Sequence, residues 1–322
     1  MRQLISIIIP CYNRKLFIAD AIDSALMHNC DSQEVIVVDD GSTDGSWDEI
    51  AKFTDKVKAV RTENGGVAKA RNRGIRLSTA KYIIFLDSDD RLGAGAVRAY
   101  STVAKGDQET IFLGLARCID EGGAACESMI YKRPSSWRSS EVPATRILSA
   151  WASNCACLIP KELILKAGGY DENLSLGEDY DLNFRMLLAG GKFQLIDEYV
   201  YDVRLHFGPK LTRNVSGERY SAMCSLFRRT WRTFREEFSL PDNCEDRVRL
   251  AQWCWSMGRT CYRAEEPEVG DEFVSLAREI AGRDARNGTP VVRALYNFLR
   301  PRDVERATEM IKSFSSAVRK PK

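Results

Sequence analysis

Apolar and polar residues alternate in blocks along the N-terminal part of the chain. Residues 4–9 and 34–39 are short, β-branched runs that are apolar at almost every position, as in strands covered on both faces. Between them, residues 17–27 repeat their apolar side chains at helical spacing. This strand–helix–strand order predicts that the two strands are parallel neighbours. The order then repeats as a strand, a helix and a strand over residues 57–62, 67–77 and 82–86.

A further set of strands is predicted after this repeat. Two strand-like stretches within residues 110–131 flank a glycine pair at positions 122 and 123, which is typical of a hairpin turn. Residues 155–159 form another apolar run of strand length. The two strands of a hairpin are antiparallel, so the sheet is expected to become mixed there.

Beyond about residue 211 the pattern changes to helices rich in arginine. These helices include residues 220–238 and 247–262. We therefore predict an α/β domain over residues 1–212, in which helices flank a mostly parallel mixed sheet. A smaller helical domain is predicted over residues 213–322.

The composition is typical of a folded protein, because 44% of the 322 residues are hydrophobic and 29% are charged. The 47 basic and 45 acidic residues give a formal net charge of +2, which does not indicate a general nucleic-acid-binding surface. The first apolar run is too short for a signal-peptide core, and no run approaches the roughly 18 residues of a spanning helix. Ten scattered cysteines suit reduced thiols better than a disulfide framework. We expect a cytoplasmic protein whose contact with a membrane would be peripheral.

Three carboxylates crowd into one turn directly after the last strand of the repeat. Asp87 and Asp89, separated by Ser88, can bind Mg²⁺ or Mn²⁺ through oxygen ligands while the metal holds a substrate's phosphates. The alternative is a helix cap, since Asp89 or Asp90 precedes a helical segment over residues 91–104. This motif alone leaves both interpretations open.

A second acidic turn, from Asp39 to Asp44, follows the strand at residues 34–39. A carboxylate at the end of such a strand can accept a hydrogen bond from a nucleobase or from a ribose hydroxyl. Asp, Gly and Ser also build ordinary turns, so the motif by itself does not separate the two interpretations.

A glycine pair at positions 65 and 66 opens the predicted helix over residues 67–77, which carries several cations. Backbone N–H groups at a helix start, together with nearby Lys or Arg side chains, stabilise phosphate oxygens. The pattern is therefore suited to a diphosphate. The alternative is a solvated basic helix face.

Glu178 and Asp179 begin another helix, after a glycine-containing loop at residues 168–171. The helix dipole favours acidic residues at a helix start, which would explain one carboxylate. For two carboxylates that follow a loop of this kind, a general base is a competing interpretation.

Together and in this order, the motifs resemble those of the family 2 glycosyltransferases, whose GT-A fold would cover roughly the first two-thirds of the chain. The resemblance implies that a Pro-x-Tyr-Asn strand end lies beside the nucleoside. It further implies a base-binding acid, a diphosphate-binding segment, a metal-binding Asp-x-Asp and a catalytic Glu-Asp pair. The implied donor-binding residues are Pro10, Tyr12, Asn13, Asp39, Asn64, Gly66, Lys69, Arg71, Asp87 and Ser88.

The resemblance also implies a reaction. Asp179 would take the acceptor's proton, and the acceptor oxygen would attack the anomeric carbon opposite the diphosphate, which inverts the configuration. Asp89 and His206 would hold Mn²⁺ or Mg²⁺, and the metal would neutralise charge on the departing nucleotide diphosphate. A lone histidine is also often structural. The implied acceptor contacts are Trp151, Tyr170, Asp171 and Glu178.

We therefore predict a metal-dependent, inverting glycosyltransferase. Its donor would be a nucleotide-diphosphate sugar, expected to be a UDP-sugar, and its acceptor a hydroxyl of a glycan or lipid-linked molecule in cell-surface polysaccharide synthesis. One alternative is a noncatalytic carbohydrate-binding or assembly protein on the same fold, against which the intact Asp87, Asp89 and Asp179 argue. The other is a sugar nucleotidyltransferase, for which the sequence has no dinucleotide fingerprint or phosphate loop.

The predicted helix over residues 220–238 is amphipathic and basic. Phe227, Trp231 and Phe234 recur on one face, and arginines crowd the others. This basic helix could lie on an anionic membrane near a lipid-linked acceptor, or its aromatic side chains could pack against the catalytic domain.

Overall fold

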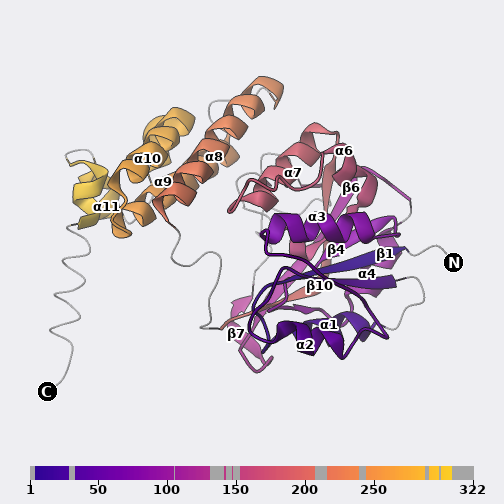
Figure 1. The fold of residues 1–322 in the computed structure, drawn as a ribbon. Helices are drawn as coiled ribbons and strands as arrows, with labels where there is room; N and C mark the ends of the chain where they lie inside the picture. Colours follow the sequence, from indigo (N-terminus) through magenta and orange to yellow (C-terminus); the bar gives the residue numbers. More distant parts are fainter. Residues whose placement is uncertain are drawn as a thin grey trace, which may run out of the picture. The chain divides into compact units, whose positions relative to one another are not determined.

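The computed structural model divides the chain into two compact units (Figure 1). The N-terminal unit comprises Met1–Ile147 and Trp151–Pro209, and the C-terminal unit comprises Leu148–Ala150 and Lys210–Lys322. The predicted boundary between residues 212 and 213 lies outside the described residues. The structure describes residues 4–28, 33–104, 106–130, 141–142, 147, 153–206, 216–238, 244–286, 290–296 and 299–306.

The N-terminal unit is built around its first strand. All seven residues of β1 (Ile5–Cys11) are buried, as expected for an apolar strand with neighbours on both sides. It runs parallel to β2 (Gln33–Asp39) on one side and to β4 (Tyr82–Phe85) on the other. Beyond β2, the strand β3 (Lys58–Arg61) is also parallel.

Helices cover both faces of this parallel part of the sheet. Figure 1 shows α3 (Val67–Leu77) on one face, and α1 (Ile18–Leu26) and α2 (Ser46–Ala51) on the other. The helix α3 lies very close to β1, because a Cβ atom on Gly74 would stand 2.3 Å from Cγ2 of Ile8. The predicted strand–helix–strand order is confirmed, with element ends that differ by one or two residues from the prediction.

The second half of the sheet is mixed, as predicted. The strand β9 (Cys157–Pro160) runs antiparallel to β4 and to β6 (Thr110–Ile119), whereas β10 (Lys192–Arg204) is parallel to β6. The predicted hairpin is formed by β6 and β7 (Ala125–Ile130), and Gly123 adopts φ 93° in its turn. The strand order is β3-β2-β1-β4-β9-β6-β10-β5, in which β5 is Arg91–Leu92, and β8 (Glu141–Val142) pairs with β10.

The helix after the acidic turn begins later than predicted. Residues 91–92 pair with β10 as strand β5, and α4 spans Ala96–Val103. The N-cap residue of α4 is Gly95, and no side chain caps the helix. Asp89 and Asp90 therefore do not cap this helix, and the capping interpretation of the acidic turn is wrong.

The parallel strands bring three polar segments to one edge of the sheet. Cys11 pairs with Asp39 and Ile8 with Phe85, so the residues after β1, β2 and β4 leave the sheet on the same side. Asn13, at φ 52°, joins two of these segments: its backbone N–H donates to Ser42 Oγ at 3.0 Å. Polar groups at the carboxyl ends of the strands are where an open α/β sheet positions its ligand.

The C-terminal unit consists of helices. Its aromatic side chains form the core: Phe227, Trp231 and Phe234 are at most 2% exposed. The ring of Phe227 stacks on Trp253 at 4.4 Å between centroids, and the guanidinium of Arg247 lies 5.4 Å from the centre of the Trp231 ring. The elements are α8 (Gly217–Phe238), α9 (Glu245–Arg263), α10 (Pro267–Ala281), the 3₁₀ turn η2 (Gly282–Ala285) and α11 (Pro290–Leu295).

The aromatic face of α8 therefore packs against residues of its own unit. Trp253 and Arg247, which contact this face, both belong to α9. The alternative in which this face lies on a membrane would require these side chains to be exposed, and they are not. In the described part of the chain, no helix has both the length and the apolar character that crossing a bilayer requires.

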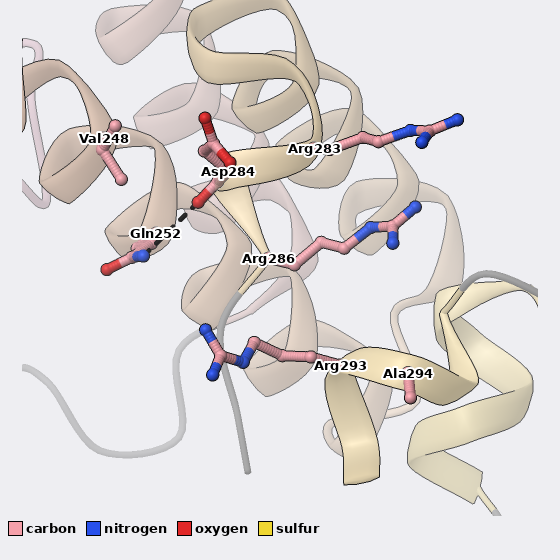
Figure 2. Close-up of a pocket in the computed structure, with 7 residues that line it drawn as sticks. All are labelled: Val248, Gln252, Arg283, Asp284, Arg286, Arg293 and Ala294. Carbon is pink, nitrogen blue, oxygen red and sulfur yellow. Dashed lines mark hydrogen bonds between the residues drawn. The ribbon is translucent and has the colours of Figure 1, made fainter. Parts of the chain in front are cut away.

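The C-terminal unit also contains a hollow of about 450 Å³ beside η2. Gln252 Nε2 donates a hydrogen bond to the backbone oxygen of Asp284 at 3.3 Å and thereby ties η2 to α9. Figure 2 shows that Arg283 in η2 and Arg286, which directly follows η2, extend in the same direction. The lining residues are Val248, Gln252, Arg283, Asp284, Arg286, Arg293 and Ala294.

Candidate active site

The acidic turn after β4 places Asp89 between two basic side chains from distant segments. Asp89 Oδ2 accepts a hydrogen bond from Arg14 Nε at 3.0 Å and lies 3.0 Å from His206 Nε2. Arg14 follows β1, and His206 follows β10, where its ring packs 4.8 Å from the ring of Phe17. Burial opposes the ionisation of Asp89, but Arg14 and His206 outweigh it and hold the pKa of Asp89 below its usual value.

Asp90, next in the turn, has a different environment. Its Oδ1 accepts the backbone N–H of Arg204 at 2.8 Å, and its Oδ2 accepts the hydroxyl of Tyr201 at 2.8 Å. Burial, followed by the charges of Asp87 and Asp89, raises the pKa of Asp90 to about 8. Asp90 thus fastens the acidic turn to β10, which brings His206 next to Asp89.

The side chains of the site offer few ligands for a divalent cation. Among the described residues, no group of three His, Cys, Asp or Glu side chains is placed to hold a metal ion. Asp89 and His206 offer one oxygen and one nitrogen ligand that face each other. Mg²⁺ is commonly bound by one or two carboxylates together with substrate phosphates and water. The site therefore fits a cation that is held partly by its substrate, but not a cation enclosed by protein ligands.

A second acidic group lies at the start of α7 (Glu178–Leu188), which follows Gly177 at φ 86°. The guanidinium of Arg71, from α3, links this group to the acidic turn. Arg71 Nη1 lies 2.9 Å from Glu178 Oε1 and 3.2 Å from Asp179 Oδ1, and Nη2 lies 3.0 Å from Asp87 Oδ1. One buried cation thus joins three carboxylates that the sequence places in two motifs.

The two oxygens of Asp179 are engaged very differently. Oδ1 accepts hydrogen bonds from Arg71 at 3.2 Å, from Asn154 Nδ2 at 3.2 Å and from the hydroxyl of Tyr170 at 3.0 Å. Among the described residues, Oδ2 has two longer contacts, with Ser153 Oγ at 3.3 Å and with the backbone N–H of Asn154 at 3.4 Å. Hydrogen bonds therefore fix the position of Oδ1, and Oδ2 is the oxygen better able to accept a further proton.

The carboxylates around Arg71 disfavour further negative charge. Burial first, and then the charge of Asp179, raises the pKa of Glu178, while Arg71 lowers it. For Asp87, desolvation first and then the charges of Asp89 and Asp179 raise the pKa against the opposing effect of Arg71. The site is thus an acidic region that a cationic or proton-donating ligand would stabilise.

Asp40 holds the glycine pair at the start of α3. Its Oδ1 accepts the N–H of Gly65 at 2.9 Å and its Oδ2 accepts the N–H of Gly66 at 2.8 Å. Asn64 Nδ2 donates to the backbone oxygen of Asp40 at 3.1 Å. In this structure the N–H groups that the sequence suggests for a diphosphate are therefore paired with a carboxylate. The side chain of Lys69 lies over Gly65, where a Cβ atom would meet its Cδ at 2.3 Å.

Asp39 ends the neighbouring strand and is fully buried. Its Oδ1 accepts the backbone N–H of Ser42 at 3.2 Å, and its Oδ2 lies 3.1 Å from Arg61 Nε. Pro10 is buried within β1, whereas Tyr12 just beyond it is 46% exposed. Tyr12 is therefore an exposed aromatic side chain at this edge of the sheet.

Sequence comparison identifies the fold that carries these groups. Residues 6–160 match the sequence model of glycosyl transferase family 2. The N-terminal unit belongs to glycosyltransferase family 2. The acidic turn after β4, the Asp39 turn and the segment that opens α3 all lie within the matched residues, whereas α7 and His206 follow them.

The chain is similar in sequence to other glycosyltransferases and similar in fold to a solved structure. The chain is 32% identical over 191 residues to an uncharacterized glycosyltransferase of Rickettsia felis, a match that covers 57% of this chain and 31% of the relative. It is 36% identical over 126 residues to the poly(ribitol-phosphate) beta-glucosyltransferase of Bacillus spizizenii, covering 37% and 20%. The matched part thus spans less than a third of either relative. A crystal structure of S. aureus TarS residues 1–349 with UDP-GlcNAc has the same fold, with a TM-score of 0.72, 18% identity and coverage of 98% of this chain and 92% of that chain.

The structure of this family 2 unit brings most of the predicted site residues to one edge of the sheet. Asp87, Asp179 and Glu178 meet at Arg71, and Asp89 meets His206. Ser88 is buried. Trp151 lies outside the described residues.

The predicted acceptor residues of the glycine loop differ in exposure. Tyr170 is only 3% exposed, and its hydroxyl donates to Asp179. Asp171 is partly exposed, and its Oδ1 accepts hydrogen bonds from the backbone N–H and the side chain of Asn173. The ring of Tyr170 therefore lies within the protein, and Asp171 is the more accessible of the two.

Sequence reasoning missed several residues of the site. The predicted site residues did not include Arg14, Asp40 or Tyr201, although each contacts a predicted site residue. Arg14 directly follows the Pro-x-Tyr-Asn stretch and Asp40 directly follows Asp39, so each adjoined a predicted residue. Tyr201 begins a Tyr-x-x-Arg-x-His stretch that ends at the predicted residue His206, and its contact with the acidic turn depends on the pairing of β10 with β5.

Proposed function

We propose that this chain is a metal-dependent, inverting glycosyltransferase that moves a sugar from a UDP-sugar to a hydroxyl group of a glycan or lipid-linked acceptor. The observation that carries the proposal is the environment of Asp179. In the part of the chain that the structure describes, three donors hold its Oδ1, and Oδ2 has two long contacts. A carboxylate held through one oxygen presents the other in a fixed direction, as a general base requires.

The same arrangement suggests the course of the reaction. Asp179 Oδ2 accepts the proton of the acceptor hydroxyl as the acceptor oxygen forms its bond to the anomeric carbon. The bond from that carbon to the diphosphate breaks, and the electron pair leaves with the diphosphate. Attack opposite the leaving group in a single displacement inverts the configuration at the anomeric carbon.

We assign the remaining groups at this edge to the donor. Asp39 and Tyr12 contact the nucleoside, and Lys69 interacts with the diphosphate through its positive charge. Asp89 and His206 hold the divalent cation, which, when bound, neutralises negative charge on the leaving diphosphate. The separate contacts of Asp39, at Ser42 and Arg61, and of Asp89, at Arg14 and His206, support this division of roles.

The relatives suggest the class of donor and acceptor. TarS, which shares the fold, was crystallised with UDP-GlcNAc, and the Bacillus spizizenii relative is named for a poly(ribitol-phosphate) acceptor. We propose a UDP-sugar and a cell-surface polysaccharide or its lipid-linked precursor. The reaction would take place in the cytoplasm, at the inner face of the membrane where the acceptor is lipid-linked.

The decisive experiment compares the wild-type protein with Asp179→Asn. We expect the variant to fold and to bind UDP-sugar with Mn²⁺ as the wild type does, while kcat for transfer falls by about 100- to 10,000-fold, because the amide cannot accept the proton. Donor binding is measured by calorimetry and transfer by release of UDP. Undiminished transfer by Asp179→Asn would show that Asp179 is not the base.

Two outcomes with the wild-type protein would favour the alternative functions. Binding of glycan without transfer of sugar would favour the noncatalytic alternative, and release of pyrophosphate from a nucleoside triphosphate would favour the nucleotidyltransferase.

A further inference from the structure

Arg71 is an almost completely enclosed cation of the candidate site. Its side chain is 4% exposed, although it carries a permanent charge. The guanidinium lies over a pair of contacting aromatic rings, 5.9 Å from the centre of Phe85 and 5.2 Å from the centre of Tyr170. A guanidinium stacked on aromatic rings has little freedom to turn, so its N–H groups are fixed in direction.

Both Nη groups of Arg71 already point at protein oxygens. Nη1 faces Glu178 and Asp179, and Nη2 faces Asp87. A diphosphate bound by Arg71 would have to displace these carboxylates. The cation that the sequence assigns to the donor is therefore directed to the carboxylates instead.

We propose that Arg71 is a positioning residue for the general base and not a ligand of the donor diphosphate. It holds Oδ1 of Asp179, so that Oδ2 faces the acceptor, and it fixes Asp179 relative to Asp87 on the donor side. This inference rests on the proposed function of Asp179. It reassigns a residue that the family resemblance places on the donor.

The shape of the guanidinium explains why arginine is needed here. Three carboxylates approach one another around the buried guanidinium, which must offset their mutual repulsion. A planar fork can serve carboxylates on both of its sides at once, whereas the ammonium group of lysine is a single point charge. Burial opposes the charge of Arg71, but Asp179, Tyr170 and Asp87 raise its pKa well above the usual value, so the charge is kept.

Two further donors act on the same oxygen and allow an independent test. Asn154 Nδ2 and the hydroxyl of Tyr170 both reach Asp179 Oδ1, and Asn154 also donates to the Tyr170 hydroxyl at 3.1 Å. Tyr170→Phe removes one donor to Oδ1 and keeps the ring that stacks on Arg71. A positioning role predicts that this change and a change of Arg71 affect the same kinetic step.

The test is Arg71→Lys, which keeps the charge and is expected to fold. We expect the dissociation constant for UDP-sugar with Mn²⁺ to stay within about twofold, while kcat falls by about 10- to 100-fold, because misplacing a reacting group by about 1 Å can cost that much. Tyr170→Phe should lower kcat in the same way and by a smaller factor. The matched control is Arg76→Gln on the same helix, since Arg76 is exposed and has one long contact, 3.9 Å to Glu172; it should leave kcat and donor binding unchanged.

The opposite outcome is equally clear. A loss of donor binding in Arg71→Lys with kcat at saturating donor unchanged would place Arg71 on the diphosphate and overturn the inference. The variant Asp179→Asn distinguishes failure of the proposed function from failure of the positioning role. If that variant still transfers sugar, the base itself is wrong, whereas if it is inactive and Arg71→Lys is fully active, only the positioning role fails.

Discussion

His206 Nε2 and Asp89 Oδ2 lie 3.0 Å apart, although the two residues are separated by 117 positions in the chain. The contact depends on strand β10, which ends at Arg204 and carries His206 to the acidic turn. It is reinforced by Asp90, which accepts hydrogen bonds from the backbone of Arg204 and from Tyr201 on that same strand. An oxygen and an imidazole nitrogen in this geometry are suitable ligands for one divalent cation.

The first prediction concerns this pair. Asp89→Ala and His206→Ala should each raise the concentration of Mn²⁺ needed for half-maximal UDP binding by about 10- to 100-fold, because each removes a ligand or its hydrogen-bonded neighbour. The measurement is a Mn²⁺ titration of UDP binding by calorimetry. His28→Gln is the control, as His28 lies at the end of the first helical segment and outside the acidic turn. A Mn²⁺ titration that is the same in all four proteins would mean that the pair does not bind the metal.

The second prediction concerns Asp90 and pH. The pKa of Asp90 is about 8 in the folded protein and about 3.9 in an unfolded chain, so the folded state retains a proton that the unfolded state releases. The stability from this group is fully present below about pH 4 and is lost as the pH rises through about 8. In the presence of a chelator, the free energy of unfolding should fall with pH in the wild type and fall less in Asp90→Asn, which cannot ionise. Equal pH dependence in urea titrations of the two proteins would contradict the assignment.

The third prediction concerns the turn that follows β2. Gly41 adopts φ 75°, and a Cβ atom there would stand 2.8 Å from the backbone nitrogen of Asn64. Gly41→Ala should lower the free energy of unfolding by about 1–3 kcal/mol, because a non-glycine residue is strained in this conformation. Gly95→Ala is the control, since no atom lies within 4 Å of its Cβ position and its φ is −98°. Urea titration measures both, and a Gly41→Ala protein as stable as Gly95→Ala would show that the turn is formed differently.

The fourth prediction concerns the aromatic face of α8. Trp231 is 1% exposed and packs under the guanidinium of Arg247. Trp231→Ala should lower the free energy of unfolding by about 3–5 kcal/mol, because it leaves a large cavity in the core of the C-terminal unit. Arg232→Ala, at the next and exposed position, should change it by less than about 0.5 kcal/mol. If Trp231→Ala left stability intact but reduced binding to anionic vesicles, the membrane interpretation of this helix would regain support.

Much of the N-terminal unit could be predicted from the sequence. The alternation of apolar runs and amphipathic segments determined the order β1-α1-β2 and β3-α3-β4, because burial on two faces and burial on one face leave different periods in the sequence. The same order places the ends of parallel strands at one edge, so the proximity of the Asp39 turn and the acidic turn was predictable. The helix after the acidic turn was placed too early, because the pairing of residues 91–92 with β10 overrides local helical preference.

What the sequence determined by itself is therefore the type and order of elements and the edge of the sheet at which charged residues collect. Only the tertiary structure decided which charges are partners: Arg71 with Asp179, Asp40 with the N–H groups of Gly65 and Gly66. The reason is physical. Periodicity records whether a side chain is buried, a property of one element, whereas a hydrogen bond of 3 Å depends on strand order, helix approach and side-chain direction across elements that are far apart in the chain.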